Sequence, residues 1–363
     1  MTIKELKIVI QKFTCLKMKN FGLFILASIL VFVAASCKKD TIEFIPKDTI
    51  TIVESDTSWD NDLSSKSNLS TNLLPTLNIE KLVNQLSPSP LSDTCNAERG
   101  GTIEIPNNVT VNIPANSCLN AQNRLCTGKL DVEILILRKK GDFILYNLPT
   151  SSGNRQLISG GVVSVKVRQN GQDVHLVLGK TIKLRYVMPE PDNSMQLFEG
   201  KLDGRFNFDW IQLPPVGLGN VRPTVTPWAD SSQRRGYDLV LDRFGLINCD
   251  KFVGDSTNFN NKFVVTLSPS FTNINTAVYV AFKDMNSVLS LAGDAHTKAF
   301  LPNGRGLPIG RVVTVISMSY IKDKFYFAKQ EVTVQSSTGT TQTVSLAPAI
   351  MEKDAIKEIL KTL

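Results

Sequence analysis

Alternation of apolar and polar residues with a period of two dominates the chain from about residue 100 onward. Every second residue in 109–113 and in 130–136 is valine, isoleucine or leucine, as in a half-buried antiparallel strand. The same alternation in 163–167 leads to Asn170-Gly171, a pair typical of type I′ turns, and then resumes with apolar residues at 174, 176 and 178. This segment therefore predicts a β-hairpin.

Short strands of this kind recur about every ten residues through the rest of the chain, which is typical of a sandwich or barrel. We expect an all-β protein with two consecutive antiparallel β-sandwich-like domains, 96–213 and 236–346, joined by a Pro-rich linker at 214–235. Residues 347–363 predict a short amphipathic C-terminal helix that covers a sheet edge. The alternative for that helix is recognition of a partner.

The amino terminus has the pattern of an export signal. Residues 21–36 are uncharged, follow Lys17 and Lys19, and would span only ~24 Å as a helix, less than the ~30 Å hydrocarbon core of a bilayer. We therefore expect a cleaved signal peptide over 1–36, with Met18 as an alternative start to Met1.

The segment VAASC, at 33–37, resembles a bacterial lipobox, which implies that the thiol of Cys37 is acylated. The alternative is a secreted protein cut at the same bond, with Cys37 as a free or paired thiol. Residues 37–95 are rich in Ser, Asp, Asn and Pro and predict a flexible tether, with a short helix at 78–86. These features predict a protein anchored through lipid to the outer membrane, facing either the periplasm or the cell surface.

Charge and composition exclude several classes of protein. The formal net charge is +7, but residues 1–37 carry five lysines against Glu5, which is +4 and leaves +3 for the remainder. That charge is too small to indicate a nucleic-acid partner. With 42% hydrophobic and 20% charged residues, the chain is neither disordered throughout nor a polytopic membrane protein.

Several motifs within 96–213 resemble, in consistent order, the ZU5-like domain of Bacteroidota envelope lipoproteins. They are Ile113-Pro114-Ala115-Asn116, Thr127-Gly128, Asn147-Leu148-Pro149-Thr150, Ser159-Gly160-Gly161, Gly179-Lys180 and MQLFEG at 195–200. Residues 244–252 and 308–317 resemble the second half of such proteins more loosely. The resemblance implies a β-sandwich and a further β domain on a lipid anchor, and it implies little about activity.

Four cysteines follow Cys37, and export would place them in an oxidising compartment. Cys118 and Cys126 flank a turn and are the first candidate disulfide, while Cys95 with either of them is the alternative. Cys249 is expected to be a lone buried thiol. No metal site is expected, because C-x-x-C spacing is absent and the chain has two histidines.

No catalytic or cofactor-binding motif is present, so no catalytic residue and no cofactor are predicted. His175 and His296 are expected on the surface. Aromatic residues near the linker are expected in the core, with a carbohydrate platform as the alternative: Trp210, Trp228, Tyr237 and Phe244. Two catalytic carboxylates of a glycosidase form no sequence motif when they are distant in the chain. Residues that could form such a pair are Glu199, Asp203, Asp209, Asp250 and Asp255.

The leading hypothesis is a lipid-anchored cell-envelope protein with a non-catalytic binding or structural role, whose partner is the membrane and an envelope protein or glycan. The alternative is a surface hydrolase that acts on glycans or peptidoglycan through such carboxylates. The ligand, the disulfide connectivity and the oligomeric state are open at this stage.

Overall fold

The computed structural model describes residues 58–60, 72–73, 85–202, 207–254, 259, 261–302, 306–336 and 340–363. All of them belong to one compact unit, Glu54–Leu363. The expected signal peptide, Cys37 and most of the expected tether lie outside the described residues. Within these ranges strands predominate, and the α-helices with defined bounds are α4 (Lys140–Leu145) and α5 (Lys353–Lys361), which confirms the all-β class and the C-terminal helix.

Two sheets form the sandwich of the first half. The nine-stranded sheet has the order β1-β13-β12-β16-β8-β6-β2, with β7 and β9 paired to β8, and the five-stranded sheet has the order β14-β15-β11-β4-β3. Strands β5 (Cys118–Leu119) and β10 (His175–Leu176) pair separately. The bounds of the other strands are β1 (Asn72–Leu73), β2 (Leu91–Asn96), β3 (Gly101–Ile105), β4 (Val109–Ile113), β6 (Lys129–Leu137), β7 (Ser151–Ser152), β8 (Arg155–Gln169), β9 (Gln172–Asp173), β11 (Ile182–Val187), β12 (Gln196–Leu202), β13 (Asn207–Gln212), β14 (Thr224–Ala229), β15 (Arg235–Leu241) and β16 (Gly245–Phe252).

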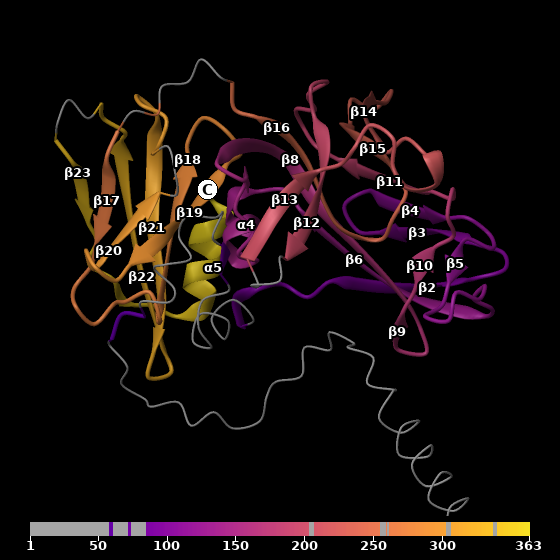
Figure 1. Ribbon diagram of the computed structural model, residues 1–363, viewed down its shortest axis with the longest axis horizontal. Helices are drawn as coiled ribbons and strands as arrows, with labels where there is room; N and C mark the ends of the chain where they lie inside the picture. Colours follow the sequence, from indigo (N-terminus) through magenta and orange to yellow (C-terminus); the bar gives the residue numbers. More distant parts are fainter. Residues whose placement is uncertain are drawn as a thin grey trace, which may run out of the picture. The chain divides into compact units, whose positions relative to one another are not determined.

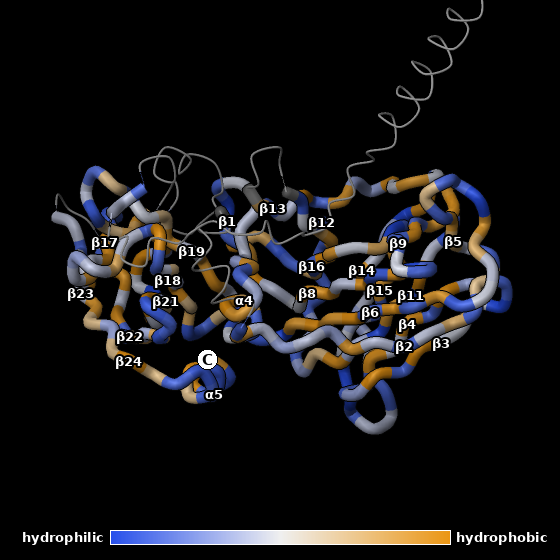
Figure 2. Tube along the Cα trace, turned by 90° about the horizontal axis from the view of Figure 1, so that it is seen from below, coloured by the Kyte–Doolittle hydropathy of each residue, from blue (hydrophilic) through white to orange (hydrophobic). Residues whose placement is uncertain are grey.

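The core of this sandwich consists of the alternating apolar residues that the sequence pattern places on one face. In β4, Val109, Val111 and Ile113 are each at most 1% exposed. Figure 2 shows hydrophobic residues recurring along β6, β8, β11 and β15, the strands that enclose this core. The periodicity therefore identifies the buried face of these strands.

The predicted hairpin turn is present, but its second arm differs from the prediction. Asn170 and Gly171 both have positive φ, 51° and 77°, as a type I′ turn requires. Val174 and Leu176 are buried, whereas Leu178 is 71% exposed. The reason is that the second arm leaves β8 after β9, and β10 then pairs with β5.

Strands from beyond the expected domain boundary complete the first sandwich. β14 lies inside the expected linker 214–235 and pairs with β15, which in turn pairs with β11. β16, expected in the second domain, inserts between β8 and β12 in the nine-stranded sheet. Strand alternation specifies which face of a strand is buried but not which strand it pairs with, so the local pattern could not assign these strands to a sheet.

Several described parts of the expected tether are structured, among them β1, which pairs with β13. β2 forms the edge of the nine-stranded sheet beside β6, with its first four residues exposed. An edge strand of this kind needs little apolar sequence. Trp59 packs against Phe300, with ring centroids 5.3 Å apart, and the Asp60 N–H donates to Asn273 Oδ1 over 2.9 Å.

The second half is a single eight-stranded sheet, in the order β23-β17-β20-β19-β18-β21-β22-β24. One apolar cluster takes side chains from β17, β18, β19, β20, β21 and β23, which are consecutive neighbours in the sheet, so this part of the sheet has a continuous core. All pairs are antiparallel except that of β17 and β23. The strand bounds are β17 (Phe263–Thr266), β18 (Thr276–Phe282), β19 (Val288–Asp294), β20 (Ala299–Pro302), β21 (Val312–Ile321), β22 (Lys324–Thr333), β23 (Gln342–Ser345) and β24 (Ala349–Ile350).

The two helices lie between the nine-stranded and the eight-stranded sheets (Figure 1). Phe143 and Ile144 of α4 and Ile356 and Leu360 of α5 are fully buried in a core that also contains residues of both sheets. α4 begins where the Asp142 carboxylate accepts the N–H groups of residues 138 and 139, each over 3.0 Å. The apolar stripe of α5 is therefore a packing surface.

We expect Gly141→Ala to destabilise the protein. An added Cβ at Gly141 would lie 2.1 Å from the Leu360 carbonyl oxygen, so α4 and α5 would have to separate. The expected loss in the free energy of unfolding is about 1–3 kcal/mol, measured by urea denaturation. The control is Gly101→Ala, whose Cβ would lie 3.4 Å from the nearest atom. Equal stability of the two variants would contradict this packing.

Candidate functional site

The three candidate disulfide cysteines lie close together in the first sandwich. Cys118 and Cys126 are on facing arms, where the Cys126 N–H donates to the Cys118 carbonyl over 2.9 Å, and Cys95 packs against the same core. All three, and Cys249, are free thiols in the structure. The Cys118 thiol lies 3.8 Å from the Ser117 hydroxyl, and burial raises its pKa to about 11. The sequence identified the facing pair, but the structure contains no bond between them.

Asp250 lies in a closed polar cluster of the nine-stranded sheet. Its Oδ2 accepts from Asn248 Nδ2 over 2.6 Å, its Oδ1 has no hydrogen-bond partner, and the residue is fully buried. Burial raises the pKa of this carboxyl well above its usual range. The neutral acid is therefore the stable form, and it is sealed from any substrate.

The other candidate carboxylates are engaged in local contacts where the structure describes them. Glu199 forms ion pairs with Arg243 and Lys201, at 2.7 and 3.0 Å. Asp209 accepts the Gly153 N–H over 3.0 Å. Asp203 and Asp255 lie outside the described residues. No acid pair facing across a cleft emerges from these contacts.

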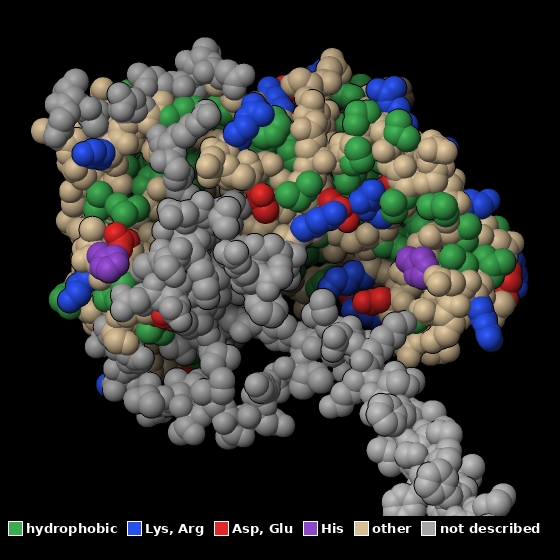
Figure 3. Space-filling view, in the orientation of Figure 1, with side chains coloured by type: hydrophobic (Ala, Val, Ile, Leu, Met, Phe, Trp, Pro, Cys, Tyr) green, Lys and Arg blue, Asp and Glu red, His purple; other side chains and the backbone are tan. Residues whose placement is uncertain are grey.

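The two histidines lie apart from each other. Both are exposed, and Figure 3 shows them on opposite sides of one face. His175 Nε2 lies 3.0 Å from Asn123 Oδ1. Among the described residues, no group of three or more His, Cys, Asp and Glu side chains could hold a metal ion. In the same part of the chain, no helix has the length and apolar character to cross a bilayer.

The aromatic residues near the expected linker are mainly core residues. Trp210 and Tyr237 are fully buried, and the Trp210 indole N–H donates to the Pro149 carbonyl over 2.9 Å. Trp228 is half-buried beneath the Arg185 guanidinium, which lies 4.8 Å from the ring centroid. Phe244 is half-buried as well. These contacts favour the core interpretation over a carbohydrate platform.

The turn between β18 and β19 joins the second sheet to the first sandwich through hydrogen bonds. Asn286 Nδ2 donates to the carbonyls of Arg138 and Ser159, over 2.9 and 2.8 Å, and the Ser159 N–H donates back to the Asn286 carbonyl. The Thr150 N–H donates to the Val288 carbonyl over 2.7 Å, and the Val288 N–H donates to Thr150 Oγ1. Reciprocal hydrogen bonds of this kind fix the position of the second sheet relative to the first sandwich.

Beside this turn lies a hollow of about 430 Å³, a size typical of small-ligand sites. Its walls come from α4, β18 and the turn after it, β21, β22 and the two residues after α5. The polar residues that line it are Lys140, Lys283, Thr314, Lys329, Glu331 and Thr362. We call it the lysine hollow.

The three lysines of the hollow differ in how they are held. Lys140 Nζ donates to the Phe282 carbonyl over 2.6 Å, and burial lowers its pKa. Lys283 pairs with Glu331 at 3.0 Å, with both side chains more than half exposed. Lys329 is exposed and forms no ion pair within the described part of the chain. Glu331 is the one acidic side chain among the lining residues, so the lysine side chains outnumber the acidic ones there.

Sequence reasoning missed the lysine hollow. Lys140, Lys283 and Lys329 are separated by more than a hundred and by more than forty residues, and no spacing rule connects them. Each lysine alone looks like an ordinary surface residue. The second sheet brings Lys283 and Lys329 to one place, and the contact between the two halves adds Lys140.

No family model, no curated protein and no solved structure matches this chain. The geometry of the molecule is therefore the basis for a functional proposal.

We expect Asp250→Asn to stabilise the protein increasingly as the pH rises. Because the folded pKa of Asp250 is raised, the wild type loses stability as the pH rises from about 4, the unfolded pKa, toward the folded pKa. The neutral amide removes this loss. The free energy of unfolding of the variant, relative to that of wild type, should therefore rise by at least ~1 kcal/mol between pH 4 and pH 7.

Urea unfolding at both pH values measures this difference. Asp93→Asn, at an exposed position on β2, is the matched control. A stability difference between Asp250→Asn and wild type that is the same at pH 4 and pH 7 would contradict a buried neutral acid.

Proposed function

We propose that the protein is a lipid-anchored cell-envelope protein of the outer membrane with a non-catalytic binding role. The lipobox-like segment ending at Cys37, the polar spacer after it and the ZU5-like motifs support the anchor and its location. The acyl chains on Cys37 would hold the protein at the membrane, since each buried methylene contributes about 0.8 kcal/mol.

The lysine hollow is the observation that carries the binding role. Ammonium groups at its wall and the hydroxyl of Thr314 are donors suited to a carboxylate or phosphate group. The hydrogen-bonded junction holds the walls in place, so the site is formed before the ligand arrives, which reduces the cost of binding. The ligand we propose is a small anion or an anionic group of an envelope polymer.

The hydrolase alternative gains no support from the described carboxylates. Asp250 is sealed in the core, and Glu199 is neutralised by Arg243 and Lys201. Neither is placed to act as the acid or base of a glycosidase pair.

Acylation of Cys37 is expected to be visible as radiolabelled palmitate incorporated into the wild-type protein in bacterial cells. Cys37→Ala should abolish the label, because the thiol that receives the lipid is gone. Cys95→Ala, the matched cysteine variant, should keep it. Labelling that survives Cys37→Ala would disprove this anchor site.

Anion binding is expected to weaken at least about tenfold in Lys329→Glu, since a hydrogen bond to a charged group contributes about 1.5–3 kcal/mol. Isothermal titration of citrate and of inorganic phosphate measures the affinity. Lys324→Glu, on the same strand but outside the hollow, is the control and should bind as wild type does. Equal affinities for the two variants would place the anion elsewhere.

A further inference from the structure

Two loops of the first sandwich meet and expose large apolar side chains together. One loop follows β10 and contains Leu178, and the other joins β13 to β14 and contains Val216 and Leu218. These three side chains are 71%, 58% and 50% exposed. We call the two loops, 177–181 and 213–223, the loop pair.

The loop pair is in direct contact along its backbone. A Cβ added to Gly219 would lie 2.3 Å from the Gly179 nitrogen and 3.0 Å from Leu178 Cγ. Gly219 also has a φ of 66°, a conformation that favours glycine. The segments that carry the exposed Leu178 and Leu218 are therefore adjacent, and Val216 is two residues before Leu218 in the same loop.

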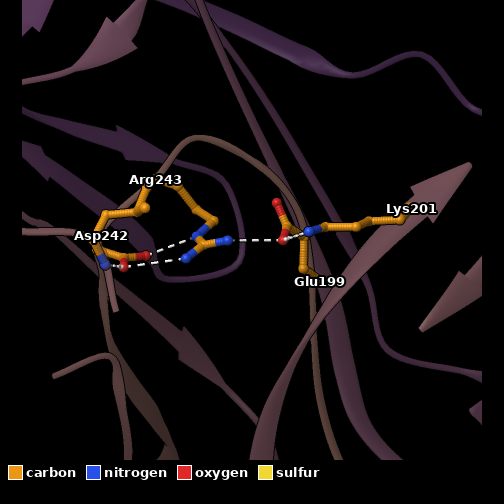
Figure 4. A network of polar contacts seen from close by, with 5 residues as sticks. Glu199, Lys201, Asp242 and Arg243 are labelled. Carbon is orange, nitrogen blue, oxygen red and sulfur yellow. Dashed lines mark hydrogen bonds and ion pairs between the residues drawn. The ribbon is translucent and has the colours of Figure 1, made fainter. Parts of the chain in front are cut away.

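A partly buried ion-pair network contacts the longer loop through Asp242 (Figure 4). The side chain of Asp242 is completely buried, and its Oδ2 accepts the Leu218 N–H over 2.5 Å. Arg243 bonds the same carboxylate over 2.8 Å and extends to Glu199 over 2.7 Å, and Glu199 pairs in turn with Lys201. This support keeps Leu218 pointing outward, where folding alone would favour its burial.

The charged residues within the loop pair have one sign. Lys180 and Arg222 are exposed, and neither forms an ion pair among the described residues. Neither loop contains an aspartate or a glutamate. Apolar tips flanked by unpaired cations are the chemistry that binds the interface of an anionic membrane.

We propose that the loop pair docks on the surface of an anionic phospholipid bilayer, with Leu178, Val216 and Leu218 inserted among the lipids and Lys180 and Arg222 at the headgroups. This contact goes beyond the covalent anchor, because it would orient the folded unit on the membrane. It is independent of the lysine hollow, which lies against the second sheet.

Hydrogen–deuterium exchange of the full chain tests the proposal, because it reports on each segment separately from any other membrane attachment. Vesicles of phosphatidylglycerol and phosphatidylcholine should slow exchange in 214–221 at least threefold, and pure phosphatidylcholine should have less effect. The double variant Val216→Ser, Leu218→Ser should lose this protection. Ile350→Ser, which is 58% exposed on β24, is the matched control and should keep it.

Unchanged exchange in 214–221 on anionic vesicles would overturn the proposal. Protection that appears without lipid and grows with protein concentration would also overturn it, and would assign the surface to a second copy of the chain. The double variant Lys180→Glu, Arg222→Glu tests the electrostatic contribution to binding. It should reduce the protection of 214–221 on anionic vesicles to the level seen on neutral vesicles. Citrate binding should be unchanged in all these variants, so failure here is distinguishable from failure of the proposed binding function.

Discussion

The hydrogen bonds made by the turn between β18 and β19 are the constraint on which the rest of the arrangement depends. Buried backbone groups must find partners, and here each half supplies those that the other lacks. Asn286 donates hydrogen bonds to two carbonyls of the first half, and Thr150 Oγ1 accepts one from a backbone N–H of the second half. The shared apolar core around α4 and α5 then fills the space that these bonds define. The lysine hollow exists because these hydrogen bonds fix the position of the two halves relative to each other.

Local sequence pattern was sufficient for the fold class and insufficient for the architecture. Alternation identified the buried face of β4, and Asn170-Gly171 identified a turn. The same alternation could not show that β16 inserts between β8 and β12, because pairing of strands distant in sequence depends on the whole sheet. The polar residues of β2 suggested a spacer, although an edge strand tolerates the same composition.

The candidate site was less accessible to sequence reasoning than the fold. Enzymatic motifs are detectable when spacing along one strand, turn or helix places the groups together. Lys283 and Lys329 come from two regions of the second sheet, and the junction between the two halves adds Lys140 from α4, so their proximity is a property of tertiary structure. The exposed positions Val216 and Leu218 lie in a Pro-rich segment that, as sequence, resembles an ordinary linker.

The insertion of β16 in the middle of the nine-stranded sheet has a consequence for how the chain folds during synthesis. Until residues 245–252 are available, β8 and β12 each present an open edge to solvent and to other chains. The first half therefore cannot close as an autonomous N-terminal domain at the point where its sequence pattern ends near residue 213. Closure of this sheet is deferred until most of the polypeptide has emerged, and during that interval the chain depends on chaperones or rapid completion to avoid edge-to-edge association.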